Sequence, residues 1–256
     1  MQATLSLAEL AQLMQVEPPQ EGPMGLWRFA LRGVGAGETL FRQGDRFRSM
    51  YVVRTGFFRS SFIRGTTEHM VAFPMTGDAL GMDGIGPGVH PVETAALSDA
   101  QVAVVPYALL EQMECLHGAP GEILLRLLCR ENACKSELVS LLGRRNSASR
   151  AAAFLLRQGK RFGALGYSHS DFPMPMRHAD VGSYLGLRPE TLSRAFAALS
   201  AARLARISLK AVEILDVEGL RAVADGAKAE PVARTKAPAA RGTARALRPA
   251  AEARVQ

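Results

Sequence analysis

The chain has 256 residues, a formal net charge of +7 and a hydrophobic fraction of 48%. This length favours two small domains. It contains no run of about 18 or more apolar residues, and Ser6, Glu9 and Gln12 interrupt the region where an export signal would be apolar. Three cysteines are too few for a disulfide framework. We therefore expect a cytoplasmic protein that has no membrane partner.

Charge is distributed unevenly along the chain. Between Arg64 and Arg126 there are eight acidic residues and no Lys or Arg, whereas Arg144 to Arg206 contains eleven basic and three acidic residues. From Gly226 to the end there are seven basic and two acidic residues. An acidic middle and a basic C-terminal part predict that one part senses or assembles and the other binds a polyanion. The alternative is a solvated basic surface.

The N-terminal half is typical of a β domain. Residues 1–24 form a variable segment with a weak helical pattern and no function that we can infer. Within residues 25–118, glycines separate short apolar runs such as 50–53 and 102–105, which predicts a small sandwich or barrel. The glycine-rich loop at 81–88 has no phosphate-binding motif and no Lys or Arg nearby.

Residues 119–147 change to a helical period and predict an amphipathic helix of roughly eight turns. We expect one side to lie on the barrel and another to pair with a second copy of the chain, because a helix this long has two sides to bury. The alternative is a core helix in a single domain. The predicted dimer seam consists of Leu124, Leu127, Cys134, Leu138 and Leu141.

Residues 148–224 predict a winged helix-turn-helix. A short helix at 180–185 is followed by a turn at 186–188, and Pro189 then begins the next helix at a favoured first position. Two later strand-like runs flank a short turn and form the predicted wing. Residues 225–256 are rich in Ala, Arg, Lys and Pro, so we expect a disordered basic tail.

The second helix of this motif presents polar side chains near its start, where such helices enter the major groove. Arg194 has the donors for guanine, Glu190 has the acceptor for the cytosine amine, and Ser193 fits beside a thymine methyl. The alternative for Glu190 and Arg194 is a surface ion pair worth about 0.3 kcal/mol. The predicted DNA-contacting residues are Arg177, His178, Arg188, Glu190, Thr191, Ser193 and Arg194.

These motifs resemble the CRP/FNR family. The barrel motif is Gly37-Glu38-Thr39-Leu40-Phe41-Arg42-Gln43-Gly44-Asp45, followed by Met50-Tyr51-Val52-Val53 and Thr55-Gly56. The DNA-binding motif is Asp180-Val181-Gly182-Ser183-Tyr184-Leu185-Gly186-Leu187, followed by Glu190-Thr191-Leu192-Ser193-Arg194. The resemblance implies an α+β chain with a cyclic-nucleotide-binding-like β-barrel (a jelly roll), a long dimerisation helix and a C-terminal winged helix-turn-helix.

The form Glu-Thr-x-Ser-Arg resembles the FNR branch. That implies a homodimeric transcription regulator of the FixK type, an activator or a repressor, which reads TTGAT half-sites in double-stranded DNA and works with RNA polymerase. The implied biological role is gene control linked to oxygen, nitrogen oxides or redox state. The alternative is a sensor module whose barrel binds haem or a nucleotide. An enzyme is a distant third, because the sequence contains no recognisable catalytic constellation.

Three departures from the family set the cofactor expectations. Relatives that hold an iron–sulfur cluster bind it with a group of N-terminal cysteines and one barrel cysteine. Here no cysteine precedes Cys115, and Ala103 stands where the barrel cysteine is expected. Cyclic-nucleotide binders hold the phosphate with a late barrel arginine, and none occurs here. His178 stands where relatives often have arginine. We expect no iron–sulfur cluster, no other metal site and no cyclic AMP, and haem stays open.

Overall fold

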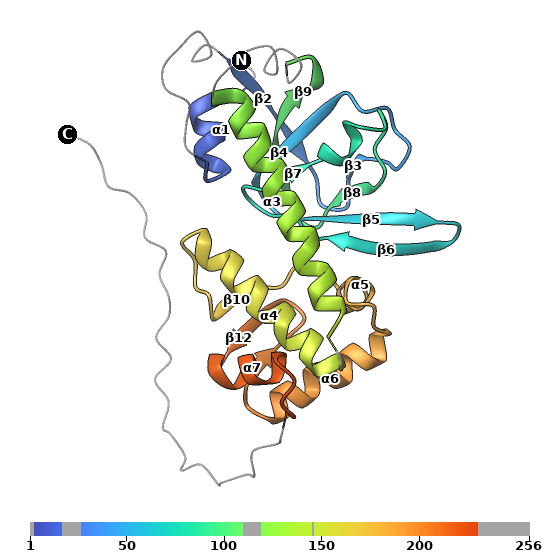
Figure 1. Cartoon of the computed structure of the whole chain (residues 1–256), viewed down its shortest axis with the longest axis vertical. Coiled ribbons are helices and arrows are strands. Elements are labelled where there is room, and N and C mark those ends of the chain that lie inside the picture. Colours follow the sequence, from blue (N-terminus) through green and yellow to red (C-terminus); the bar gives the residue numbers. More distant parts are fainter. Residues whose placement is uncertain (1–2, 17–26, 110–118, 145, 230–256) are drawn as a thin grey trace, which may run out of the picture.

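The computed structural model describes residues 3–16, 27–109, 119–144 and 146–229, and for residues 119–124 it describes the backbone alone. A β domain lies at one end, a mainly helical domain lies at the other, and the long helix α3 (Ala119–Leu142) passes from one to the other (Figure 1). This is the α+β architecture that the sequence predicts.

The β domain consists of two antiparallel sheets. One has the order β1-β2-β9-β4-β7 and the other has the order β3-β8-β5-β6. The strands are β1 Thr4–Ser6, β2 Arg28–Val34, β3 Thr39–Phe41, β4 Ser49–Thr55, β5 Phe58–Arg64, β6 Thr67–Ala72, β7 Ala79–Leu80, β8 Glu93–Ala96 and β9 Ala100–Pro106. In β2 the buried Phe29 and Leu31 alternate with more exposed neighbours, which directs one face of the sheet into the barrel core.

Residues 4–16 are part of the β domain, although the sequence placed the domain boundary after residue 24. Strand β1 pairs with β2 through the register Leu5 to Phe29. Helix α1 (Leu7–Leu13) begins at Ser6, whose hydroxyl accepts from the backbone of Glu9 while the Glu9 carboxylate accepts from Ser6. A strand of three residues is too short to show alternation, so the sequence did not reveal it.

Helix α3 ends at Leu142 instead of continuing to residue 147. Gly143 follows it, and the next helix, α4 (Ser147–Ala164), begins with its own cap, in which the Asn146 side chain accepts from the Ser149 backbone at 2.7 Å. An asparagine cap fixes a helix start because it satisfies a backbone donor that the helix leaves unpaired. The predicted helix over 119–147 therefore ends early, and a short joint separates it from α4.

The structure also corrects the face of α3 that is open to a partner. Leu127 is buried in the barrel core and Leu141 in the core of the C-terminal domain, while Cys134 and Leu138 are half-buried. The side chain of Leu124 lies outside the described part. Two members of the predicted seam are therefore covered within one chain, because each helix turn has to close the core of its own domain.

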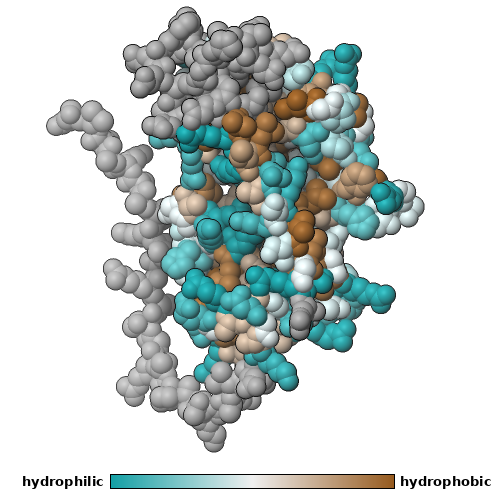
Figure 2. Space-filling view, in the orientation of Figure 1, coloured by the Kyte–Doolittle hydropathy of each residue, from teal (hydrophilic) through white to brown (hydrophobic). Residues whose placement is uncertain are grey.

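A different apolar set on α3 is exposed. It consists of Leu125, Leu128, Val139 and Leu142, which are 61%, 43%, 69% and 37% exposed, and we call it the exposed strip. Each member lies one position after a residue of the predicted seam, and the four form two pairs three residues apart, with Leu128 and Val139 eleven positions apart. Hydrophobic side chains follow the course of α3 in Figure 2.

The C-terminal domain is a winged helix-turn-helix. Helices α5 (His178–Tyr184) and α6 (Pro189–Ala201) form the motif, and α7 (Val217–Ala224) packs against α4. The wing strands β11 (Ala205–Ile207) and β12 (Ala211–Ile214) are joined by a third strand, β10 (Asp171–Pro173), which the sequence did not predict. Most of the predicted basic tail, residues 230–256, lies outside the described residues.

The two domains are held together by polar contacts around Asp78, in the loop between β6 and β7. Its carboxylate pairs with Arg130 of α3 at 3.1 Å and with Arg161 of α4. Arg161 also donates to the carbonyl of Phe73 at 2.9 Å. On the other side of the junction, Ser183 of α5 accepts from the backbone of Met70 in β6 at 3.0 Å. No helix among the described residues is long and apolar enough to cross a membrane.

Candidate nucleic-acid interface

The turn between α5 and α6 is determined by two glycines and a proline. Gly186 has φ +61°, a conformation that L side chains rarely adopt. A Cβ at Gly182 would lie 3.0 Å from the carbonyl oxygen of Leu187, whose amide donates back to Gly182 at 2.9 Å. Pro189 then occupies the first turn of α6, where its missing N–H is not needed. These local requirements set α6 at a fixed angle to α5.

Helix α6 has one buried and one exposed face. Leu192, Ala195, Phe196 and Leu199 are buried in the domain core. Glu190, Ser193 and Arg194 are exposed, and Thr191 is half-buried. The guanidinium of Arg194 lies 3.4 Å from the backbone oxygen of Glu190, and within the described part of the chain no ion pair joins the two side chains. Both charged groups are therefore open to a ligand on this face.

Arg177 and Arg188 cap the starts of the two motif helices. The Arg188 side chain is exposed at the start of α6. Arg177 donates from Nε and an Nη atom to the Asp180 carboxylate at 3.0 and 2.9 Å. Hydrogen bonds to Asp180 raise the pKa of Arg177. The carboxylate is buried but the Arg177 side chain is 69% exposed, so this arginine is oriented by Asp180 and still faces solvent.

His178 is half-buried at the start of α5. Its ring packs edge-on against Phe196 of α6 with centroids 5.3 Å apart. Its Nε2 is buried and makes no hydrogen bond within the described part of the chain. The buried Nε2 is not available to a phosphate, and a DNA contact through the rest of His178 stays a prediction. The ring closes the space between α5 and α6.

The wing adds a candidate that the sequence analysis did not single out. Lys210 lies in the exposed turn between β11 and β12, beside Leu209, which is 76% exposed. The Ser208 hydroxyl accepts from the backbone of Ala211 at 2.9 Å and shapes the turn. A lysine at the tip of a turn next to a helix-turn-helix is the signal that could have indicated it.

A cavity of about 470 Å³ lies between the barrel, α3 and α4. Its barrel wall includes Asp78, Asp83, Leu80 and Val92. The cations that reach it come from the helices, and of these Arg161 is already paired with Asp78. Burial raises the pKa of the Asp83 carboxyl. The cavity is therefore lined on the barrel side by acids and apolar groups.

Comparison with known proteins assigns both domains. Residues 31–114 match the cyclic nucleotide-binding domain and residues 149–223 match the Crp-like helix-turn-helix domain. The transcriptional activator protein FnrA of Stutzerimonas stutzeri is 36% identical over 197 residues, covering 77% of this chain and 81% of the relative. The chain belongs to the CRP/FNR family. It is thus an FNR-like member of a family of DNA-binding transcription regulators, not of enzymes.

Further relatives agree with this assignment. The fumarate and nitrate reduction regulatory protein of Salmonella typhimurium is 31% identical, covering 73% of this chain and 76% of the relative. Among solved structures, FixK2 from Bradyrhizobium japonicum is similar with a TM-score of 0.68 and 24% identity, covering 76% of this chain and 96% of FixK2. At that identity the structural match supports the fold alone.

Some members of the CRP/FNR family hold an iron–sulfur cluster, and the cysteines described here do not suit one. Cys129 is exposed and Cys134 is half-buried on α3. Five residues of helix separate them by about 140°, so the two thiols point in different directions. Among the described residues, no three His, Cys, Asp or Glu side chains lie close enough to hold a metal ion. Cys115 lies outside the described residues.

His90 of this CRP/FNR-family barrel is buried in an aromatic setting. Its ring stacks on Phe41 with centroids 3.9 Å apart and meets the edge of Phe47. Its Nδ1 makes no hydrogen bond within the described part of the chain. Burial lowers the pKa of His90 below its ordinary value of 6.5. The folded protein therefore binds a proton here less readily than the unfolded chain does.

This difference predicts a loss of stability in mild acid. As the pH falls below 6.5, the unfolded chain takes up a proton at His90 first, and the free energy of unfolding drops until the folded-state pKa is passed. His90→Phe keeps the stacking and removes this proton, so its stability should fall less than that of the wild type. Urea unfolding at a series of pH values tests this. The control is His69→Gln on the exposed hairpin, and equal pH profiles for His90→Phe and the wild type would contradict the prediction.

Proposed function

We propose that the protein is a homodimer that binds a two-fold symmetric DNA site with TTGAT-type half-sites and controls genes linked to oxygen, nitrogen oxides or redox state. The observation that carries the proposal is the open face of α6, where Glu190 and Arg194 are exposed and not paired with each other. Both groups have the chemistry to read base edges in the major groove. Arg188, Thr191 and Ser193 belong to the same proposed reading face, and Arg177 and Lys210 are proposed phosphate contacts.

The exposed strip of α3 supports the homodimer. A row of large apolar side chains on a helix surface is unfavourable in water, and a second copy of the helix would bury it. A symmetric dimer presents two α6 helices, which fit half-sites one helical turn apart, about 34 Å. The name of the FnrA relative describes it as a transcriptional activator. We further propose that this protein also activates transcription and that its partner in doing so is RNA polymerase.

Fluorescence anisotropy with labelled duplexes tests this function. A palindrome of TTGAT half-sites should bind with an affinity at least about a thousandfold above that of a scrambled duplex of the same length. A duplex with one half-site and duplexes with changed half-site spacing are the controls. Equal affinity for the palindrome and the scrambled duplex would contradict the proposal.

We also propose that no iron–sulfur cluster and no cyclic AMP take part. Four thiolate ligands are not available from three cysteines. A buried phosphate needs a cationic partner, and the barrel segment 65–125 contains no Lys or Arg. Anaerobically purified protein should show no iron-linked absorption band, and calorimetry should detect no micromolar binding of cyclic AMP. Either signal would contradict the proposal.

The cavity of about 470 Å³ favours a second candidate, a sensor whose barrel ligand controls DNA binding. Uncharged small molecules suit its acidic and apolar barrel wall, whereas the two propionates of haem would have to face the helix cations Lys135 and Arg157. The two candidates differ in one measurement: the sensor requires its ligand for palindrome binding, whereas the first candidate binds without addition. Anisotropy on ligand-stripped protein, with and without haem, separates them.

Removing residues 227–256 should weaken non-specific DNA binding and leave folding and sequence preference unchanged. The C-terminal region from Gly226 carries seven basic residues and two acidic ones, and each phosphate neutralised adds about 0.9 to the slope of log affinity against log salt. Anisotropy between low and high salt compares the truncated and full chains. An identical slope would show that this segment does not contact DNA.

A further inference from the structure

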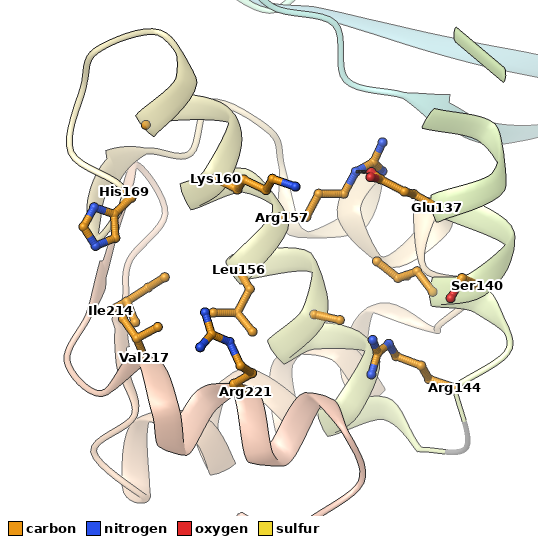
Figure 3. Close-up of a pocket in the computed structure, with 13 residues that line it drawn as sticks. Glu137, Ser140, Arg144, Leu156, Arg157, Lys160, His169, Ile214, Val217 and Arg221 are labelled. Atoms are coloured by element: carbon orange, nitrogen blue, oxygen red, sulfur yellow. Dashed lines mark ion pairs between the residues drawn. The ribbon is translucent and has the colours of Figure 1, made fainter. Parts of the chain in front are cut away.

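A groove of about 590 Å³ lies in the C-terminal domain, between the end of α3, helix α4 and helix α7. This volume lies in the range of small-molecule sites, roughly 300–1,000 Å³. The apolar side chains of Leu141, Ala153, Leu156, Ile214 and Val217 line its floor. Figure 3 shows Leu156 near the centre of the groove with charged side chains arranged around it.

The rim of the groove is strongly basic. Arg144, Arg157, Lys160 and Arg221 line it together with His169, and Glu137 is the one acidic residue among the lining residues. Arg221 pairs with Glu218 at 2.7 Å, and Arg144 lies 3.6 Å from the exposed carboxylate of Asp225. Lys160 has no ion pair in the described part of the chain. The groove therefore keeps an excess of positive charge.

Two donors in the rim are buried without a hydrogen bond. They are the Nε atoms of Arg144 and Arg157. Arg157 Nε lies 3.0 Å from a carboxylate oxygen of Glu137, but the N–H is not aligned with it. A buried guanidinium donor that lacks an acceptor is unfavourable, and a carboxylate is the acceptor that matches guanidinium geometry best. Arg157 also donates to the Tyr184 hydroxyl and to the carbonyl of Cys134 at 3.4 Å. An anionic ligand in the groove therefore meets the exposed Lys160 and Arg221 first.

The groove is separate from the other surfaces of the protein. No residue of α5, α6 or the wing turn lines it, so it does not belong to the proposed DNA-reading face. On α3, Glu137 and Arg144 are seven residues apart and share one side, whereas Val139 of the exposed strip lies about 160° away from Glu137. A partner helix on the exposed strip would leave the groove open.

The basic C-terminal region does not supply a suitable occupant. The region after Gly226 carries seven basic and two acidic residues, so the basic rim repels it. An external ligand therefore has to bring the negative charge, and the apolar floor requires a hydrophobic body attached to that charge.

The groove lies between the helix that carries the exposed strip and the helices of the DNA-binding domain. One ligand would contact α3, which carries the exposed strip, and also α4 and α7 of the DNA-binding domain. The joint at residues 143–146 separates α3 from α4, and a guanidinium nitrogen of Arg144 already donates to the carbonyl of Ala224 across this joint. A ligand that binds one arrangement of the joint more tightly shifts the population toward that arrangement.

We propose that this groove is an effector site for a small organic carboxylate with a hydrophobic body. The carboxylate contacts the cationic rim at its exposed members Lys160 and Arg221, and the body lies on Leu156 and Val217. Binding is a property of the protein alone, while its effect on DNA rests on the function proposed above. The two are therefore measured separately.

Calorimetry on the full chain tests the site, with phenylbutanoate as the probe. Phenylbutanamide has nearly the same shape without the charge, and adenosine monophosphate offers phosphate chemistry. The proposal expects phenylbutanoate to bind with one site per chain and the amide to bind at least about tenfold more weakly, since a charge-assisted contact is lost. Equal binding of acid and amide, or tighter binding of the nucleotide, would overturn the assigned ligand class.

The double variant Lys160→Gln/Arg221→Gln locates the site. Both side chains are exposed, so folding should persist. The variant should weaken phenylbutanoate binding about tenfold or more. The control Arg42→Gln/Arg64→Gln removes the same charge from exposed positions on the barrel and should leave binding unchanged. If the two double variants behave alike, the groove is not the site.

Palindrome binding with and without the probe then tests the effector role. Saturating phenylbutanoate should change the palindrome affinity of the wild type by about fivefold or more and should not change that of the groove variant. Unchanged affinity with the groove occupied would overturn the effector role. Failure of palindrome binding in the absence of any probe would instead count against the proposed function.

Discussion

Val139→Glu is expected to convert the protein into a monomer and to reduce its affinity for the TTGAT palindrome by about 100-fold or more. Val139 is the most exposed residue of the exposed strip, at 69%. In the proposed dimer it meets the partner helix, where two glutamates would bring two carboxylates into an apolar seam. Affinity falls because, in a dimer, binding at one half-site holds the second chain at a high effective concentration near the other half-site. A monomer lacks this effect.

Ala133→Glu is the matched control for this variant. Ala133 is exposed on α3, six residues from Val139, and therefore lies about 120° away around the helix. It adds the same charge outside the exposed strip, so it should leave the mass and the affinity unchanged. Analytical ultracentrifugation gives the oligomeric state, and anisotropy gives the affinity. A dimeric Val139→Glu protein would show that the exposed strip is not the interface.

Arg194→Ala is expected to reduce palindrome affinity by about 1–3 kcal/mol, or roughly 5- to 150-fold, and to relax the preference at the guanine of the half-site. The guanidinium is exposed on α6, donates from Nε to the backbone oxygen of Glu190 and makes no ion pair within the described part of the chain, so its two terminal nitrogens keep their donors for a base edge. Anisotropy with all four base pairs at that position measures the preference.

Glu190→Ala gives a sharper result in the same experiment. A carboxylate facing a polyanion is repelled unless it accepts from a base, so its removal should raise non-specific affinity and lower discrimination at the cytosine. Lys210→Ala on the wing is the control, because losing a phosphate contact should weaken binding about equally on every sequence. If Glu190→Ala weakened binding to all DNA sequences equally, Glu190 would have a structural role instead.

The helix-turn-helix was predictable because its signals are local. Gly186 and Pro189 fix the turn within a few residues, and the spacing of Leu192, Phe196 and Leu199 marks the inner face of α6. The barrel strands were predicted because glycine turns separate their short apolar runs. The boundary before α4 was predicted at 147–148 and lies at Ser147, behind the Asn146 cap, whereas the earlier end of α3 at Leu142 was not predicted.

By itself the sequence determined the order of the elements, the family and the polar residues at the start of α6, since each depends on neighbouring residues. Only the tertiary structure decided what long-range contacts determine. It decided which leucines of α3 are exposed. Two adjacent faces of this helix carry apolar residues, and the cores of the two domains cover one of these faces and leave the other open. It placed His178 against Phe196, and it brought Arg144, Lys160 and Arg221 from three helices to one groove.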